Sequence, residues 1–312
     1  MSSPLPVVKL GVTSYQPPEV IGDSVRVTRR FAGLLGGLSK AEVDAIFTQL
    51  PFTPADASKS ATDLRRSART ELAKQPPVDA GPLPTKPIPV EAQPVGEEVQ
   101  KRHSFKRWYE AVADYDFGLV PIASLLTPQW QVDLDYVDEL AAQAPHPEDW
   151  SAALAFAMPE GTIGEPVVSQ NQVIFSSHRA DLFCAQIPEV RSTGPGVYEI
   201  VVTAHSRPNY LQVVRLKNRL ILTNGVHKTL AMSKRGYSEI PCVIRTAGAY
   251  EELGLTHMWS FLRPEVVEGA RPILVQDFLN DGLAAPLLMR GTDQVLRVSV
   301  IIEQLSIPAL QA

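Results

Sequence analysis

The alternation of apolar and polar positions is clearest between residues 210 and 245. Two runs rich in β-branched residues and leucine, YLQVVRL and RLILTN, flank the polar dipeptide Lys217-Asn218, and this order predicts a β-hairpin. A helical pattern follows from about Val226 to Arg235, and Gly236 stands where a helix end favours glycine. The run EIPCVIR then predicts another strand. The segment therefore predicts a hairpin, a helix and a strand in succession.

Strand and helix patterns also alternate in the residues before this hairpin. EPVVSQNQVIFSS reads as strand material, SSHRADLFCAQI as a capped helix that begins near Ser177, and GVYEIVVTAHS as a strand rich in β-branched residues. Such alternation predicts an α/β fold, a mixed sheet with flanking helices. We expect its core at about residues 165–245, inside a domain of residues 101–312 that also has a C-terminal extension.

The residues before this domain form two expected segments. Residues 1–74 are expected to be an N-terminal arm with a short amphipathic helix, because Ser39 and Glu42 form a capping box ahead of apolar residues at helical spacing, and Pro51 ends the pattern. Residues 75–98 are rich in proline and poor in large apolar side chains, which predicts a linker or an extended strap. We expect the later domain to fold without the arm.

Composition narrows the class of protein. The chain has 312 residues, 45% of them hydrophobic, and a formal net charge of -5, which argues against duplex DNA as a partner. Cys184 and Cys242 lie among apolar residues without metal-ligand spacing, so both are expected to be reduced, buried thiols. No signal-peptide pattern and no apolar run of membrane-spanning length is present. We therefore expect a cytoplasmic protein.

An anion site is predicted where the second hairpin strand passes into the helix. A helix start leaves backbone N–H groups unpaired and carries the positive end of the helix dipole. Asn224 is a possible cap, Gly225 allows a ligand to approach the backbone, and His227 and Lys228 lie in the first turn. The alternative is an ordinary Asn-Gly turn with a structural histidine and a solvated lysine, and the residues alone leave both open.

The segment NGVHKTLAMSKRGYSEIPCVI resembles the ParB/sulfiredoxin superfamily, over about a quarter of the chain. The resemblance implies a ParB/sulfiredoxin-like core whose helix start and basic residue hold nucleotide phosphates, so the implied ligand is a nucleotide, with Mg, or another phosphate-bearing small molecule. The matching positions are Asn224, Gly225, His227, Lys228, Ala231, Gly236, Ile240 and Pro241.

Departures from that pattern limit the activities it implies. Val226 stands where sulfiredoxins have their catalytic cysteine, so that reaction is not expected. Lys228 replaces the usual arginine and loses its bidentate fork. Neither a helix-turn-helix nor a basic DNA-binding segment follows, which disfavours DNA segregation.

Some relatives transfer or hydrolyse phosphoryl groups, which requires a carboxylate or a metal ion near the phosphate. Glu199 and Glu239 are the nearest candidates in sequence, and surface carboxylates are the alternative interpretation. Arg207 and Asn209, in the loop before the hairpin, are further candidates for ligand binding.

Two functions follow from these patterns. The first is a cytosolic protein that binds a nucleotide or other phosphate at Asn224 to Lys228, with phosphoryl transfer or NTP hydrolysis as an associated activity. The alternative is a non-enzymatic assembly protein that keeps the fold and docks on a larger protein partner, or on itself, through residues 1–100. Whether the protein is an enzyme is left open.

Overall fold

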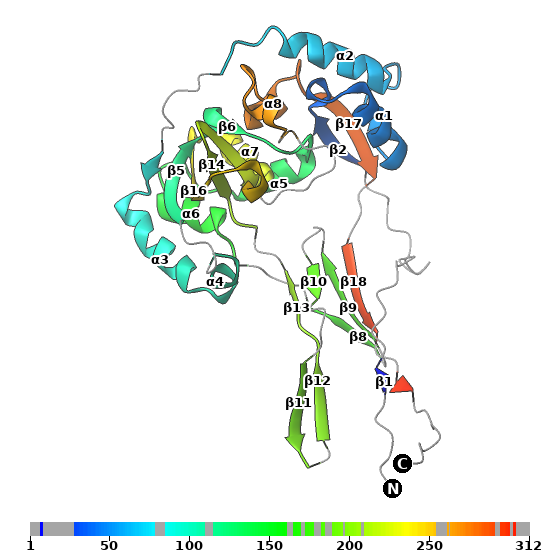
Figure 1. Cartoon of the computed structure of the whole chain (residues 1–312), viewed down its shortest axis with the longest axis vertical. Helices are drawn as coiled ribbons and strands as arrows, with labels where there is room; N and C mark the ends of the chain where they lie inside the picture. The colour runs from blue at the N-terminus through cyan, green and yellow to red at the C-terminus, as the bar shows by residue number, and fades with distance from the viewer. Residues whose placement is uncertain are drawn as a thin grey trace. The chain divides into compact units, whose positions relative to one another are not determined.

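The chain forms two compact units in the computed structural model (Figure 1). The core unit comprises Arg26–Glu160 and Pro208–Gly291, and the strand unit comprises Met1–Val25, Gly161–Arg207 and Thr292–Ala312. The structure describes residues 7–8, 28–78, 85–109, 115–160, 165–169, 172–177, 182–184, 189–195, 197–206, 209–253, 261, 263–290, 294–299 and 302–303.

The core unit is mixed α/β, which confirms the predicted fold class. Its larger sheet has six strands with both parallel and antiparallel neighbours, because β14 pairs with β15 antiparallel and with β16 parallel. The strand order is β4 (Lys86–Pro87), β5 (Tyr115–Pro121), β16 (Glu239–Ala247), β14 (Gln212–Leu216), β15 (Arg219–Asn224) and β6 (Leu125–Leu126).

The predicted hairpin, helix and strand are all present in this sheet region. β14 and β15 join through Lys217 and Asn218, with Lys217 at a positive φ of 52°, as tight hairpin turns require. The helix α7 (Val226–Lys234) follows, and Gly236 ends it at a φ of 94°. Strand β16 then returns to the sheet centre. The local pattern therefore predicted these elements correctly.

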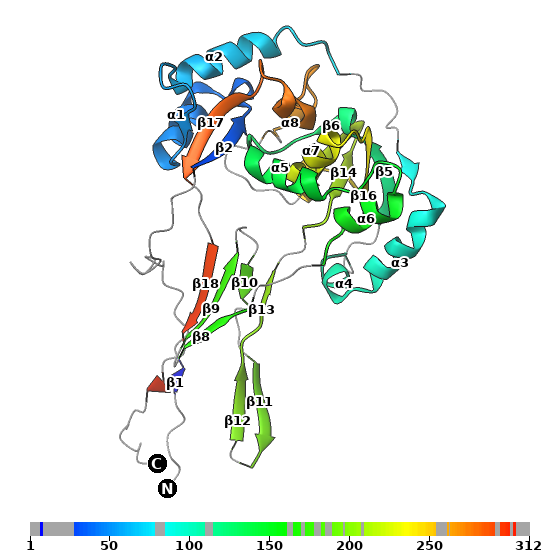
Figure 2. The ribbon, with the colours of Figure 1, turned by 180° about the vertical axis from the view of Figure 1, so that it is seen from behind.

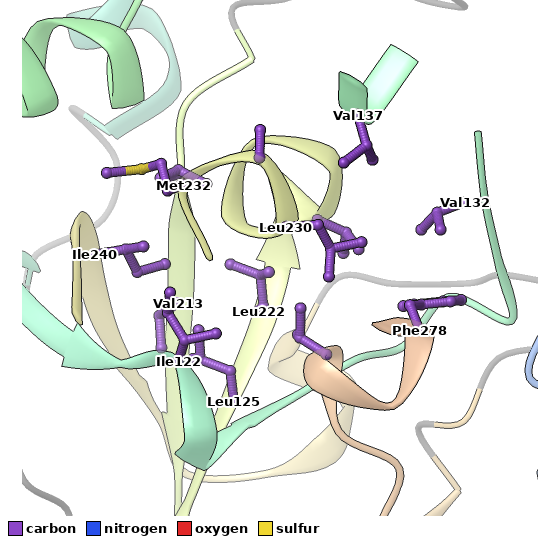
Figure 3. Packing of buried hydrophobic residues seen from close by; sticks show 14 of the residues in the cluster. Ile122, Leu125, Val132, Val137, Val213, Leu222, Leu230, Met232, Ile240 and Phe278 are labelled. Carbon is purple, nitrogen blue, oxygen red and sulfur yellow. The ribbon is translucent and has the colours of Figure 1, made fainter. Parts of the chain in front are cut away.

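Helix α7 covers one face of the six-stranded sheet, as Figure 3 shows. Leu230 and Met232 of the helix belong to the same buried cluster as Val213, Leu222 and Ile240 of the strands.

The other α-helices described in this unit are α1 (Lys40–Gln49), α2 (Ala61–Leu72), α3 (Gln93–Lys101), α4 (His103–Tyr109), α5 (Leu134–Gln143), α6 (Trp150–Ala157) and α8 (Pro264–Val267). The short 3-10 helices are η1 (Leu35–Gly37), η2 (Val90–Ala92), η3 (Ile122–Ser124), η4 (Tyr250–Leu253) and η5 (Val275–Leu279). Within the described ranges, no helix combines the length and the apolar character needed to cross a membrane.

A second, four-stranded antiparallel sheet corrects the expected N-terminal arm. Its order is β3 (Thr53–Pro54), β17 (Ala285–Arg290), β2 (Thr28–Gly33) and β7 (Gln131–Asp133). Residues 28–72 thus belong to the core unit, where α1 and α2 lie beside β2 and β17 (Figure 2). Phe31, Leu35 and Ile46 are buried in the main core.

The boundary expected near Lys101 is therefore not where the chain divides. Pairing of β2 with β17, two segments far apart in sequence, joins the N-terminal residues to the rest of the core unit. The capped helix predicted inside the arm is confirmed, since Ser39 and Glu42 form both hydrogen bonds of a capping box at the start of α1.

The expected linker at 75–98 also contains regular structure. β4 pairs with β5, and η2 leads directly into α3, which begins at Gln93. Ala92 and Val99 are buried there. Residues 79–84 lie outside the described part of the chain. The second half of this segment is therefore part of the core unit and not a linker.

The strand unit consists of small antiparallel sheets. One has three strands in the order β18 (Gln294–Ser299), β9 (Gln172–Ser177) and β8 (Val167–Ser169). The two-stranded sheets are β10 (Leu182–Cys184) with β13 (Ala204–Ser206), β11 (Glu189–Gly194) with β12 (Val197–Val201), and β1 (Val7–Val8) with β19 (Ile302–Glu303).

Two expectations are corrected in this unit. The helix predicted from near Ser177 is wrong where the structure describes it, because β9 ends at Ser177 and Leu182–Cys184 pairs with β13 as a strand. The core expected at 165–245 is divided, since its first half lies in the strand unit and β14, β15, α7 and β16 lie in the core unit.

Candidate functional site

Gly225 is the residue at which the chain turns from β15 into α7. Its φ of 97° lies in the left-handed region, and no side chain caps the helix at this position. An added Cβ would lie 2.2 Å from Cδ2 of Leu211. Glycine is therefore needed here for the backbone conformation and for packing against Leu211.

Lys228 is directed into the protein. The residue is 3% exposed, and its ammonium group donates hydrogen bonds to the carbonyl oxygens of Asn209 and, at 3.5 Å, Ala157. Ala157 is the last residue of α6, and the ring of Phe156 lies 6.0 Å from the same Nζ atom. A cation at a helix C-terminus is stabilised by the negative end of the helix dipole. Lys228 thus joins α7 to the end of α6 and to the loop before β14.

His227 joins the start of α7 to the start of α5. Its Nε2 atom accepts a hydrogen bond from the backbone N–H of Asp133 at 3.1 Å, and its ring lies 5.4 Å from that of Tyr136. The carboxylate of Asp133 caps α5 by accepting from the N–H of Tyr136 at 3.0 Å, and it forms an ion pair with Arg29 at 2.6 Å. The residue that contacts His227 through its backbone N–H, Asp133, therefore also carries a negatively charged side chain.

Asn224 is the last residue of β15 and pairs with Gln212 across the hairpin. The carbonyl oxygen of Gln212 accepts from the hydroxyl of Thr223, and its side-chain oxygen accepts from the phenol of Tyr109 at 3.0 Å. Burial raises the pKa of Tyr109 far above its usual range, so the phenol remains a proton donor. Arg207 and Asn209 were both predicted as ligand residues in the loop before β14. Asn209 accepts the hydrogen bond from Lys228, and Arg207 lies outside the described residues.

The two carboxylates proposed for catalysis lie in different places. Glu199 is on the exposed strand β12 of the strand unit, opposite Arg191. Glu239 begins β16 and forms an ion pair with Lys86 at 2.7 Å. It follows the C-terminal end of α7, and a nine-residue helix is roughly 13 Å long, so Glu239 and Gly225 lie at opposite ends of that helix.

The structure therefore brings together Asn224, Gly225, His227, Lys228 and the backbone of Asn209. It adds two residues that the sequence reasoning missed, Leu211 and Asp133. Asp133 had a local signal, since it precedes the helical run LDYVDEL as a cap residue does. Leu211 had none, because its contact with Gly225 depends on how the hairpin and the helix pack.

The predicted magnesium ion has no cluster of ligands in the described part of the chain. No group of three or more histidine, cysteine, aspartate or glutamate side chains there is arranged to hold a metal ion. Comparison with known proteins found no matching family model, no matching curated protein and no matching solved structure.

Proposed function

We propose that the protein is a non-enzymatic assembly protein, and that it associates with a second copy of itself through the strand unit. The observation that supports this most is the exposure of the side chains described in this unit. Among the residues of this unit whose exposure the structure describes, none is buried. Small sheets whose faces stay exposed have little independent stability in water, and we infer that the exposed described residues of this unit contact a partner surface.

The ribbon of β11 and β12 is the surface we propose for this contact. Val190 pairs with Ile200, and Ser192 pairs with Tyr198, so these four side chains share one face of the ribbon. Val190, Tyr198 and Ile200 are 62%, 65% and 48% exposed. We call Val190, Ser192, Tyr198 and Ile200 the apolar ribbon face.

The opposite face of the same ribbon carries its charged side chains, and Val197 and Val201 of β12 share that face by alternation. It carries Glu189, Arg191 and Glu199, and Arg191 forms an ion pair with Glu189 at 2.7 Å. Alternation of this kind is typical of a ribbon with one face in water and the other against an apolar surface. Covering the three large apolar side chains would stabilise the assembly by about 1 to 2 kcal/mol each.

A second copy fits this face because the face carries no charge. Two identical apolar ribbon faces can meet about a two-fold axis without like-charge repulsion, and the charged side chains of both ribbons then remain in water. The proposed contact lies on β11 and β12, at residues 189–201, and not in residues 1–100, where the sequence had suggested it.

Light scattering coupled to size-exclusion chromatography tests this function. We expect the parent protein to be a dimer, or to become one as its concentration rises. The variant Tyr198→Ser/Ile200→Ser should be monomeric. The matched variant Arg191→Ser/Glu199→Ser changes two side chains on the opposite face of the same ribbon and should still dimerise. A monomeric parent at all concentrations, or equal dissociation of both variants, would contradict the proposal.

A nucleotide or phosphate site at the start of α7, in a ParB/sulfiredoxin-like core, is the second candidate function. It is favoured by the left-handed Gly225, which begins a nine-residue helix without a side-chain cap. The inward contacts of His227 and Lys228 leave the backbone N–H groups as the main ligands in this proposal. A thermal-shift measurement with nucleotides, with and without magnesium, tests it, since a ligand that binds only the folded state raises the apparent melting temperature.

A further inference from the structure

One face of helix α2 lines a groove of about 640 Å³. The lining residues of the helix are three or four positions apart, which places them on one continuous side. Lys40, at the start of α1, completes the lining. The residues of α2 and its C-terminal cap in this groove are Thr62, Arg65, Arg66, Arg69, Thr70 and Ala73.

The opposite side of α2 fixes this face in position. Leu64 and Ala68 are buried, and Leu72 packs partly buried against the main core. Ser60 and Asp63 form both hydrogen bonds of a capping box at the start of the helix. The basic residues therefore project from a helix that is anchored by its apolar side, and the views in Figures 1 and 2 place α2 beside α1.

Most of the positive charge in the groove has no carboxylate partner. Arg66 forms an exposed ion pair with Asp63 at 3.1 Å. For Lys40, Arg65 and Arg69, no carboxylate among the described residues lies within ion-pair distance. The Nε atom of Arg65 donates to the carbonyl oxygen of Leu38 at 2.7 Å, which orients its guanidinium. Like charges at this spacing destabilise a helix surface, and an anion in the groove would remove that cost.

We propose that this groove binds a polyphosphate anion, either the triphosphate chain of a nucleotide or inorganic polyphosphate. Guanidinium groups match phosphate oxygens in bidentate geometry, and the hydroxyls of Thr62 and Thr70 are further donors to such oxygens. The volume is in the range of small-molecule sites. The groove is separate from the helix start at Gly225, and the inference does not depend on the proposed assembly.

The lining also distinguishes between classes of anion. It contains no aromatic side chain on which a nucleobase of single-stranded nucleic acid would stack. Its only apolar member is Ala73, so an acidic peptide would find no apolar pocket for an anchoring side chain. Phosphate oxygens need only the charged and hydroxyl donors that are present.

Isothermal titration calorimetry at low salt, with the full chain, tests the proposal. The titrants are inorganic tripolyphosphate, ATP and a polyglutamate peptide. We expect tripolyphosphate to bind the parent, and Arg66→Gln/Arg69→Gln to weaken its affinity about tenfold or more. The variant Lys59→Gln/Lys74→Gln removes two positive charges that do not line the groove, and its affinity should fall less than about twofold. Lys40→Gln leaves α2 intact and should also weaken binding.

The outcomes separate the sources of phosphate. Equal affinity for ATP and tripolyphosphate would show that the groove recognises the phosphate chain alone. Tighter binding of ATP would show that the nucleoside also contacts the protein. Three results would overturn the proposal: no heat of binding with tripolyphosphate, equal losses in the groove and control variants, or binding of polyglutamate alone. ATP binding that survives Arg66→Gln/Arg69→Gln and Lys40→Gln, while tripolyphosphate binding is lost, assigns the nucleotide to another site and supports inorganic polyphosphate as the anion of the groove.

Discussion

Leu211 occupies the space that a side chain at Gly225 would need, since its Cδ2 atom lies 2.2 Å from the position of an added Cβ. Leu211, the residue before β14, therefore packs closely over the start of α7. The glycine at the centre of the predicted phosphate site therefore has a structural role of its own, and substitutions there change stability as well as binding.

Gly225→Ala should lower the free energy of unfolding by about 2 to 4 kcal/mol, through left-handed strain and the collision with Leu211. Gly236→Ala is the matched control, because its φ is 94° and no atom lies within 4 Å of an added Cβ. It should lose only about 1 kcal/mol. Urea denaturation of both variants measures the difference. Equal losses would show that Leu211 moves aside without cost.

Lys228→Met should destabilise the protein by about 1 to 3 kcal/mol, because the carbonyl oxygen of Asn209 loses its charged donor in a buried place. The comparison variant is Lys234→Met, on the same helix. Lys234 forms a partly exposed ion pair with Asp138, so its loss should be below about 1 kcal/mol. Chemical denaturation distinguishes the two, and a larger effect at Lys234 would contradict the inward role of Lys228.

Acid should weaken the contact between α5 and α7 at Asp138. The hydrogen bond from Lys234, at 2.6 Å, is the largest cause of a pKa below the usual range for this carboxyl, and partial burial opposes it. Because the folded state binds this proton less readily than the unfolded state, the contact contributes stability above pH ~4 and loses it as the pH falls through the lowered folded pKa. Unfolding free energies between about pH 6 and pH 3 should therefore fall less steeply for Asp138→Asn than for the parent. Identical slopes would refute the contribution.

Removal of the N-terminal residues should have two different results. A chain that begins at Arg26 keeps β2 and should retain a cooperative unfolding transition for the core unit. A chain that begins at Ala73 lacks β2, β3, α1 and α2, so β17 loses both of its neighbours, and Phe278 and Leu287 lose part of the cluster that buries them. We expect this shorter chain to aggregate or to unfold without cooperativity in calorimetry. A sharp transition in the shorter chain would restore the idea of a separate arm.

Local signals predicted the parts of the fold that depend on local contacts. Three local features are as expected: the capping box of Ser39 and Glu42, the hairpin turn at Lys217 and the helix end at Gly236. Each depends only on residues a few positions apart in the sequence. The free thiol of Cys242 is buried as expected, and burial raises its pKa. The side-chain exposure of Cys184 lies outside the described residues.

The sequence-based predictions were wrong where residues far apart in the sequence pack against each other. The residues before Ser39 were assigned to the N-terminal arm, because nothing near them in sequence indicates that Phe31 pairs with Leu287 of β17. Lys228 looked like a solvated charge or a phosphate ligand, because its partners Asn209 and Ala157 approach it only when α6 packs against β16 in the folded core unit. Helical spacing places a side chain on a face, and only the tertiary structure shows what lies opposite that face.

The antiparallel pairing of Thr28 with Arg290 has a mechanical consequence. Thr28 begins β2 and Arg290 ends β17, so the two residues lie side by side at the same end of the two inner strands of the sheet. A force that pulls Arg26 and Gly291, the ends of the core unit beside this pair, away from each other would load the hydrogen bonds between β2 and β17 one after another. Such a geometry yields at low force, whereas strands pulled along their length share the load among all their bonds. Tension applied at these two ends would therefore open the core unit at β2 and β17 first.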